Sequence, residues 1–310
     1  MSAWGVPSSA SGGKRPDDFR HGQRSNMTIR EIIQHTAHML EGAGIDTARL
    51  DAEVLLAFFL NCDRTGLIKN YDRQITAGRL SDFHRLVKRR LAFEPIAYIT
   101  GRKEFWSFRL EVNRDVLIPR PDTEIIVEEA LGLYRNLSMN RPRIADIGTG
   151  SGAIALALAG EIPDALVVAT DISAAALEVA KRNAAALGLE ARISFVLGDL
   201  FENVSGLFDL IVSNPPYIGS AEYATLAPGV KDYEPHMALW AGQTGLEFYE
   251  KLIYQAHDRL KEKGWLLLEI GAGQDQAIAS LMTARGGFYD DLSVRADYAG
   301  HPRVIKGRRK

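Results

Sequence analysis

Cysteine is almost absent from this 310-residue sequence, in which Cys62 is the single example. One thiol excludes an intrachain disulfide, a thiolate zinc cage and a Cys-x-x-Cys redox pair, and such scarcity is typical of a reducing compartment. His35 and His38 lie in a helical pattern without a carboxylate-rich neighbourhood. We therefore expect surface or packing histidines there, and no metal site.

Long apolar runs and an excess of one charge are also missing. No run of apolar residues approaches the length of a membrane span. The net charge of −2 provides no general attraction to nucleic acid and leaves room only for a local basic patch. These absences favour a protein that requires neither a membrane nor a direct nucleic-acid partner. We also expect it to be a cytoplasmic monomer.

The first part of the chain divides into a tail and a helical segment. Residues 1–26 are rich in Ser, Gly, Pro and charge and show no apolar period, which predicts a disordered tail. Residues 27–95 carry apolar side chains at helical spacing, and Thr28 with Glu31 has the form of a capping box. This segment predicts a small all-α domain for substrate recognition, with helices at about 29–42, 47–60, 64–70 and 76–91.

Residues 96–121 predict a β-hairpin linker between two domains. Every second residue from 106 to 112 is apolar, which predicts one strand with a single buried face. Residues 113–115 (Asn-Arg-Asp) include residue types that are common in turns. A return strand would follow at 116–118 and would end at Pro119-Arg120-Pro121, because proline cannot donate a ladder hydrogen bond.

Strand patterns alternate with helix patterns in residues 122–310, which predicts an α/β domain with a Rossmann-like, doubly wound parallel sheet. The expected strands are 144–147, 166–170, 193–197, 208–213, 265–270, 288–294 and 303–306. The expected helices are 123–134, 153–159, 173–187, 246–260 and 274–285. Asp122 would cap the first of these helices. Residues 218–243 show little periodicity, and a connection of this length is typical of a lid or binding segment.

A glycine-rich turn follows the first strand of this domain and opens an apolar helix. Its residues are Asp146, Ile147, Gly148, Thr149, Gly150, Ser151 and Gly152. Glycines permit a tight turn and let a ligand approach the backbone, while amides at the helix start can receive a polar or anionic group. The turn therefore predicts a cofactor site. Gly148, Gly150 and Ala153 also satisfy the loose dinucleotide fingerprint, so the glycines alone do not separate a nicotinamide cofactor from S-adenosylmethionine.

Carboxylates follow the next two strands. Asp171 ends the second strand, where a carboxylate can accept hydrogen bonds from both ribose hydroxyls of an adenosine. Its alternative role is to cap the helix after Ser173. Asp199 follows the third strand, where it would bond an adenine amino group while Leu200 lines the base. The alternative role for Asp199 is a turn cap.

The fourth strand ends in Asn214-Pro215-Pro216-Tyr217, which would bind the substrate. In isolation this segment is only a turn, but its prolines fix the backbone and make the strand tip stiff. An amide or aromatic-amine nitrogen is a poor nucleophile because its lone pair is delocalised. The side-chain carbonyl of Asn214 and the backbone carbonyl of Pro215 would accept its two N–H bonds, which orients the nitrogen and favours charge developing on it. Tyr217 would stack on the flat group.

All these features would lie at one edge of the sheet, because parallel strands place their carboxyl ends together, and open α/β sheets bind ligands there. A hydride-transfer enzyme has no evident need for a rigid Asn-Pro-Pro-Tyr, whereas a methyltransferase acting on an amide or aromatic amine does. The sequence therefore predicts methyl transfer from S-adenosylmethionine, which leaves S-adenosylhomocysteine, and requires no metal and no covalent intermediate.

Several longer segments closely resemble one known family, the glutamine N5-methyltransferases of peptide chain release factors. The similarity runs from about residue 28 to the end. The segments are Pro95-Ile96-Ala97-Tyr98-Ile99-Thr100-Gly101, Glu104-Phe105-Trp106, Leu117-Ile118-Pro119-Arg120-Pro121-Asp122-Thr123-Glu124, Asn214-Pro215-Pro216-Tyr217-Ile218, Tyr233-Glu234-Pro235 and Leu268-Glu269-Ile270-Gly271. Adenine N6-methyltransferases share the glycine turn and the Asn-Pro-Pro-Tyr, but they are not expected to share the helical front domain, the hairpin or the Pro-Arg-Pro segment.

The resemblance implies a class I methyltransferase fold and a substrate glutamine in the Gly-Gly-Gln motif of class I release factors, hence a role in translation termination. It implies cofactor contacts at Gly148–Gly152, Asp171, Leu200 and Asn214, and substrate contacts at residues 214–217. The alternatives are a nucleic-acid adenine N6-methyltransferase, a catalytically idle cofactor-binding or scaffold protein, and a nicotinamide oxidoreductase.

Two further positions complete the expected site. Arg120 would contact the substrate and, with Glu124, border the active site, unless the two residues serve an interdomain salt bridge instead. The sequence departs from the family at two points, since members often carry Glu where Asp122 stands and Trp where Leu200 stands. The second departure alters the expected packing beside the adenine.

Overall fold

The computed structural model describes residues 26–137 and 139–310. The expected disordered tail, apart from residue 26, lies outside the described residues. The chain forms two compact units, the first ending at Ile96 and the second spanning Ala97–Lys310. Within the described residues, no helix has the length and apolar character needed to cross a membrane.

The first unit is built from the four helices expected from the apolar spacing. They are α1 (Ile29–Gly42), α2 (Ala48–Leu60), α3 (Arg64–Lys69) and α4 (Ala77–Leu91). The capping box that begins α1 is confirmed, because the Thr28 side chain accepts from the Glu31 N–H and the Glu31 carboxylate accepts from the Thr28 N–H. A pair of two-residue strands, β1 (Met27–Thr28) and β2 (Gln74–Ile75), was not predicted, since two residues carry no period.

The hairpin exists, but only one of its two predicted strands is correct, and that strand lies on the second side of the turn. After the short helix α5 (Ile96–Thr100), strand β3 (Arg102–Phe105) pairs antiparallel with β4 (Phe108–Glu111) around a two-residue turn that begins with Trp106 at φ +54°. The predicted strand at 106–112 therefore contains β4 but begins in the turn, because the apolar alternation includes Trp106. Residues 116–118 form no return strand. The hairpin belongs to the second unit.

The second unit contains a seven-stranded sheet in the order β10-β11-β9-β8-β5-β6-β7. Its strands are β5 (Arg143–Ile147), β6 (Leu166–Asp171), β7 (Ile193–Leu197), β8 (Phe208–Ser213), β9 (Leu260–Glu269), β10 (Tyr289–Ala296) and β11 (Pro302–Arg309). The seven strands are those expected from the sequence. Strands β5 to β9 are parallel, whereas β11 is antiparallel to both β9 and β10, so the sheet is mixed rather than fully parallel.

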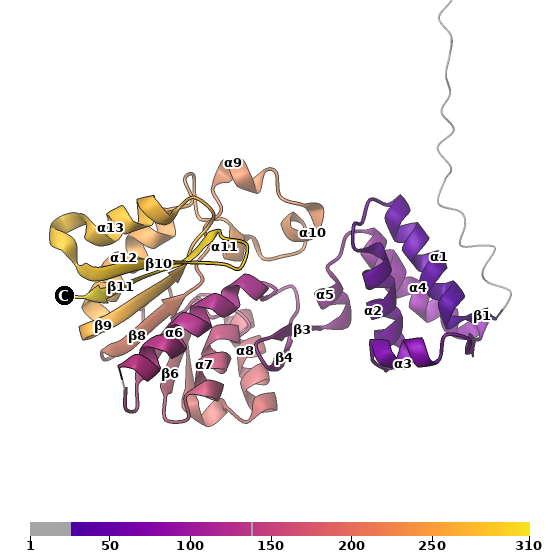
Figure 1. Ribbon diagram of the computed structural model, residues 1–310, viewed down its shortest axis with the longest axis horizontal. Coiled ribbons are helices and arrows are strands. Elements are labelled where there is room, and N and C mark those ends of the chain that lie inside the picture. The colour runs from indigo at the N-terminus through magenta and orange to yellow at the C-terminus, as the bar shows by residue number, and fades with distance from the viewer. Residues whose placement is uncertain (1–25, 138) are drawn as a thin grey trace, which may run out of the picture. The chain divides into compact units, whose positions relative to one another are not determined.

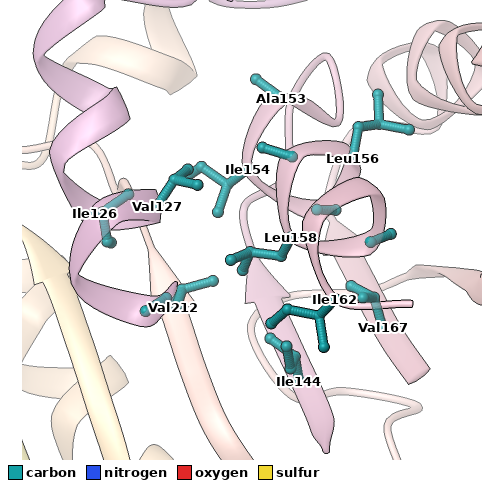
Figure 2. Packing of buried hydrophobic residues seen from close by; sticks show 14 of the residues in the cluster. Ile126, Val127, Ile144, Ala153, Ile154, Leu156, Leu158, Ile162, Val167 and Val212 are labelled. Carbon is teal, nitrogen blue, oxygen red and sulfur yellow. The ribbon is translucent and has the colours of Figure 1, made fainter. Parts of the chain in front are cut away.

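Helices cover both faces of this sheet (Figure 1). They are α6 (Glu124–Asn136), α7 (Ala153–Glu161), α8 (Ala174–Leu187), α12 (Glu247–Arg259) and α13 (Asp275–Gly287). Alternate strand residues enter different cores: Ile144 and Leu210 pack with α6 and α7, while Ala145 and Ile211 pack with α12 and α13. Figure 2 shows aliphatic side chains of α6 and α7 meeting those of the strands. The doubly wound architecture is confirmed.

The connection between β8 and α12 has little regular structure, as expected. It contains three single-turn helices, α9 (Ser220–Tyr223), α10 (Pro228–Lys231) and α11 (His236–Leu239). Backbone pairing of Ile218 with Trp240 closes the base of this segment. The ring of His236 lies between Tyr223, at 4.9 Å between centroids, and Trp240, at 5.2 Å. These contacts give the connection a fixed internal shape.

Candidate active site at the carboxyl edge of the sheet

The strand register brings the predicted site residues to one edge. Ile147 at the end of β5 is paired with Thr170 of β6 on one side and with Ser213 of β8 on the other. The glycine turn, Asp171 and Asn214 therefore lie at the carboxyl ends of three adjacent strands. The chain turns outward in opposite directions from β5 and β8, and this switch point is where doubly wound sheets bind ligands.

The glycines of the turn serve two different purposes. Gly148, Gly150 and Gly152 all have positive φ, at +73°, +56° and +84°. A Cβ added to Gly148 or Gly150 would meet nothing within 4 Å, so the turn leaves free space beside its backbone. A Cβ at Gly152 would lie 3.2 Å from both Ala180 Cβ and Leu156 Cδ1, so this glycine lets α7 pack closely against α8.

The other side chains of the turn point inward. Asp146 is buried, and its Oδ2 accepts from Thr149 Oγ1 at 2.6 Å and from the Ala155 N–H at 3.1 Å. Burial raises the pKa of Asp146 to about 7. The Ser151 carbonyl accepts from Asn183 Nδ2 at 2.9 Å, and Thr149 and Ser151 are also buried. These three side chains support the turn on its buried side.

Asp171 links the end of β6 to the glycine turn. Its Oδ2 accepts from the Gly150 N–H and its Oδ1 from the Ser173 N–H, both at 2.9 Å. Burial raises the pKa of Asp171. Ser173, not Asp171, caps α8 by accepting from the Ala176 N–H. Each carboxylate oxygen keeps capacity for another hydrogen bond, so Asp171 fits an acceptor role toward hydroxyl groups.

The two residues after β7 differ in exposure. Asp199 is exposed, and its N–H donates to the Glu202 carboxylate. Leu200 has φ +52°, and its side chain is packed in the core beside Phe201 and Val204. Its carbonyl accepts from Thr170 Oγ1 at 3.1 Å, which joins this turn to β6. The Leu200 side chain is thus part of the core shared with α12.

The Asn-Pro-Pro-Tyr segment is held at both ends. Asn214 Nδ2 donates to Thr123 Oγ1 at 3.1 Å, and the Tyr217 carbonyl accepts from Gln274 Nε2 at 3.0 Å. Pro215 is buried, whereas Pro216 is half-buried. Burial, reinforced by the charge of Glu269, raises the pKa of Tyr217 to about 12, so its phenol is neutral at physiological pH.

Arg120 and Glu124 have partners within the second unit. Arg120 Nη2 lies 2.5 Å from Oε1 of Glu234, whose side chain is 1% exposed, and the other Glu234 oxygen accepts from the Ile118 N–H at 3.1 Å. The salt bridge expected for Arg120 as an alternative therefore exists, but it is not interdomain. Glu124 accepts from the Trp106 N–H at 2.7 Å and so holds the hairpin turn.

Asp122 does not cap α6, contrary to the sequence-based prediction. It lies in a 3-10 turn (Pro121–Thr123), and its carboxylate is 3.1 Å from Arg303 Nη2. Thr123 occupies the cap position instead, without a capping hydrogen bond from its side chain.

Release factor glutamine methyltransferase of Bradyrhizobium diazoefficiens is 46% identical to this chain over 286 residues, which cover 92% of the chain and 96% of that protein. The chain belongs to the release factor glutamine methyltransferase family. The resemblance inferred from the sequence is thereby confirmed. A second member, from Geobacter sulfurreducens, is 42% identical over 91% of the chain and 96% of its own length.

The domain models agree with membership of the release factor glutamine methyltransferase family. Residues 31–101 match the PrmC N-terminal domain, and residues 130–227 match the methyltransferase small domain. Among solved structures, the hMettl16 catalytic domain in complex with MAT2A 3'UTR hairpin 6 is 17% identical, with a TM-score of 0.52 over 76% of this chain and 84% of that chain. This likeness shows the shared fold, and the chain is a methyltransferase of class I architecture.

Three residues of this family member were not assigned to the site from the sequence, namely Thr123, Glu234 and Glu269. All three occur in segments that carry the family resemblance, but the segments alone gave them no role. A signal was present for Glu269, because it follows three leucines in a buried strand pattern where a carboxylate is unusual. Thr123 gave no such signal, since Thr at a helix start is expected to cap it.

Glu234→Ala is expected to destabilise the protein by about 2–4 kcal/mol, because it leaves the Ile118 N–H and the Arg120 guanidinium without their acceptor. Thermal unfolding would measure the loss. Glu178→Ala is the matched control, since Glu178 is exposed and its ion pair is with Lys181 in the same helix, and it should leave Tm unchanged. Equal melting temperatures for the two variants would contradict the prediction.

Proposed function

We propose that the protein transfers a methyl group from S-adenosylmethionine to the side-chain N5 nitrogen of the glutamine in the Gly-Gly-Gln motif of class I release factors, and so supports translation termination. The observation that carries the proposal is 46% identity over 96% of a release factor glutamine methyltransferase. The Asn214 amide at the switch point of the sheet supports it independently, because such an amide suits a planar amide substrate.

The glycine turn and the residues after β6 and β7 fit the cofactor. Open space beside Gly148 and Gly150 suits close approach of a ligand to the backbone. Asp171 has acceptor capacity for ribose hydroxyls, and Asp199 is exposed at the same edge for the adenine amino group. When bound, S-adenosylmethionine supplies an electrophilic methyl group on its sulfonium.

The Asn-Pro-Pro-Tyr segment orients the acceptor nitrogen. Asn214 Oδ1 and the Pro215 carbonyl accept the two N–H bonds of the substrate amide, which fixes the nitrogen and favours the positive charge that develops on it. Pro215 and Pro216 keep the strand tip rigid. The neutral phenol ring of Tyr217 stacks on the flat amide. Arg120, already paired with Glu234, borders the substrate.

The rest of the chain would select the protein partner. The helical residues 27–95 act as a docking module for the release factor, and the protein works as a cytoplasmic monomer without a membrane or nucleic-acid partner. Family membership supports this choice of substrate over an adenine base, because the match covers the front domain as well as the methyltransferase core.

Mass spectrometry of a co-expressed class I release factor tests the proposal. We expect one added methyl on the Gly-Gly-Gln glutamine, and none when that glutamine is replaced by asparagine. A labelled-methyl assay with purified release factor, DNA and RNA as separate acceptors is the complementary measurement. Label in nucleic acid and none in the release factor would overturn the proposal.

A further inference from the structure

Three side chains from distant parts of the chain, Glu269, Thr123 and Asn214, form a row of neighbouring polar groups that leads to the reaction edge. The Thr123 side chain at the start of α6 faces the Glu269 carboxylate at the end of β9 and lowers its pKa as a hydrogen-bonding neighbour, while Glu269 Oε2 is buried without a hydrogen-bond partner among the described residues. Thr123 Oγ1 in turn accepts from Asn214 Nδ2 at 3.1 Å. Thr123 and Glu269 are both buried, at 4% and 1% exposure. The row therefore joins a buried carboxylate to the amide that ends β8.

We propose that Thr123 and Glu269 are positioning residues that fix which way the Asn214 amide faces, so that its carbonyl oxygen is presented to the substrate nitrogen. This inference rests on the proposed function, because it concerns the orientation of the same substrate amide. Neither residue touches the reacting atoms in this scheme. Both act through Asn214.

The orientation follows from the donor and acceptor capacities of the three groups. An ionised carboxylate only accepts hydrogen bonds, so the hydroxyl hydrogen of Thr123 must point toward Glu269. The Thr123 oxygen is then left as an acceptor, and the Asn214 group that faces it must be the NH₂. The Asn214 carbonyl oxygen consequently faces the other way. A reversed amide would oppose its NH₂ to the NH₂ of the substrate, which repels.

The position of Thr123 supports a dedicated role for its hydroxyl. Thr at the residue preceding a helix usually accepts from a backbone N–H of the first turn. Thr123 precedes α6 but makes no such capping bond. Its oxygen instead accepts from Asn214 Nδ2, and its hydroxyl faces the Glu269 carboxylate. The start of α6 thus lacks a side-chain cap, because the Thr123 hydroxyl is used to orient the Asn214 amide instead.

The surroundings of Glu269 make the row sensitive to pH. Among the described residues, the ionisable side chains that interact with it electrostatically include Arg303, Arg120, Asp122, Tyr217 and Tyr249. Burial dominates and raises the pKa of Glu269 to about 7. The ionised form therefore gains population as pH rises through about 7. Below that pH a protonated Glu269 can donate to Thr123, which frees the Thr123 hydrogen and removes the constraint on Asn214.

A matched pair of variants at Thr123 tests the inference in the full chain. Thr123→Val keeps the shape without the hydroxyl, and it should lower kcat about 10–100-fold, the cost of misplacing a reacting group, while the Kd for S-adenosylhomocysteine stays unchanged. Thr123→Ser restores the hydroxyl and should recover most of the turnover. Thr283→Val, which removes an exposed hydroxyl bonded within α13, is the control and should match wild type.

Two further measurements separate positioning from a merely structural role. In an Asn214→Ala background, Thr123→Val should cause no additional loss of kcat, because the group that it positions is gone. Glu269→Gln should abolish the fall of kcat below about pH 7 at saturating substrates, since Gln accepts from Thr123 without titrating. Additive losses in the double variant, or an unchanged acidic limb in Glu269→Gln, would overturn the inference.

The outcomes also distinguish this inference from the proposed function. Wild-type protein that leaves a Gly-Gly-Gln peptide unmethylated contradicts the proposed function. If the wild-type protein methylates that peptide and Thr123→Val has the same kcat as wild type, then only the positioning role is contradicted and the proposed function stands.

Discussion

Asn214→Ala is expected to lower kcat for release factor methylation about 10²–10³-fold, the usual cost of removing one preorganised polar contact to a developing charge. The physical reason is that the substrate amide loses the acceptor that orients its nitrogen and stabilises the charge forming on it. Asn214 also binds Thr123 rather than the glycine turn, so the Kd for S-adenosylhomocysteine should change little. Single-turnover kinetics and calorimetric titration measure the two quantities separately.

Asn136→Ala is the matched control for this experiment. Asn136 is the exposed last residue of α6, the helix that Thr123 precedes, so its truncation should leave both kcat and Kd at the wild-type values. Wild-type turnover by Asn214→Ala would remove the amide from the mechanism. Equal losses of turnover and of cofactor affinity would assign Asn214 to ligand binding instead.

The second large effect is expected at Asp171. Asp171→Asn should weaken S-adenosylhomocysteine binding about 10²-fold, because hydrogen bonds to a charged acceptor contribute about 1.5–3 kcal/mol each and two ribose hydroxyls would be affected. The amide also replaces one acceptor oxygen by a donor, which opposes the N–H of either Gly150 or Ser173. Calorimetric titration with S-adenosylhomocysteine measures the change.

Asp164→Asn provides the comparison at the opposite edge of the sheet. Asp164 precedes β6, and its carboxylate accepts from the Arg141 N–H at 2.7 Å. This variant should perturb local stability without affecting the Kd. If Asp171→Asn lowers Tm but binds S-adenosylhomocysteine as tightly as wild type, then Asp171 only stabilises the glycine turn and does not bind the cofactor.

The sheet could be predicted from the sequence because its signals are long and repeated. Strands buried on both faces give continuous apolar runs, and the helices between them give a 3.6-residue period. The site edge followed from the same pattern, since Asp171 ends one strand and Asn214 comes directly after another. Neither inference required knowledge of contacts between distant residues.

The hairpin and the positioning row could not be predicted in the same way. The turn at Trp106 preserves the apolar alternation, so the pattern gives no sign that the chain reverses there. The bond from Asn214 to Thr123 spans 91 positions and depends on the orientation of one hydroxyl. Short-range periodicity carries no information of that kind, and only the packing of α6 beside β8 and β9 brings these side chains together.

The two purposes of the glycines in the turn have an evolutionary consequence. Gly148 and Gly150 border open space but have positive φ, so a side chain at these positions is opposed by the backbone conformation and by the ligand, and by no packing neighbour among the described residues. Gly152 is constrained by Ala180 and Leu156, so selection at this position comes from packing within the protein. A lineage can exchange Gly152 only by changing its neighbours as well, so this third glycine is expected to covary with position 180, whereas the first two have no described packing neighbour with which to covary.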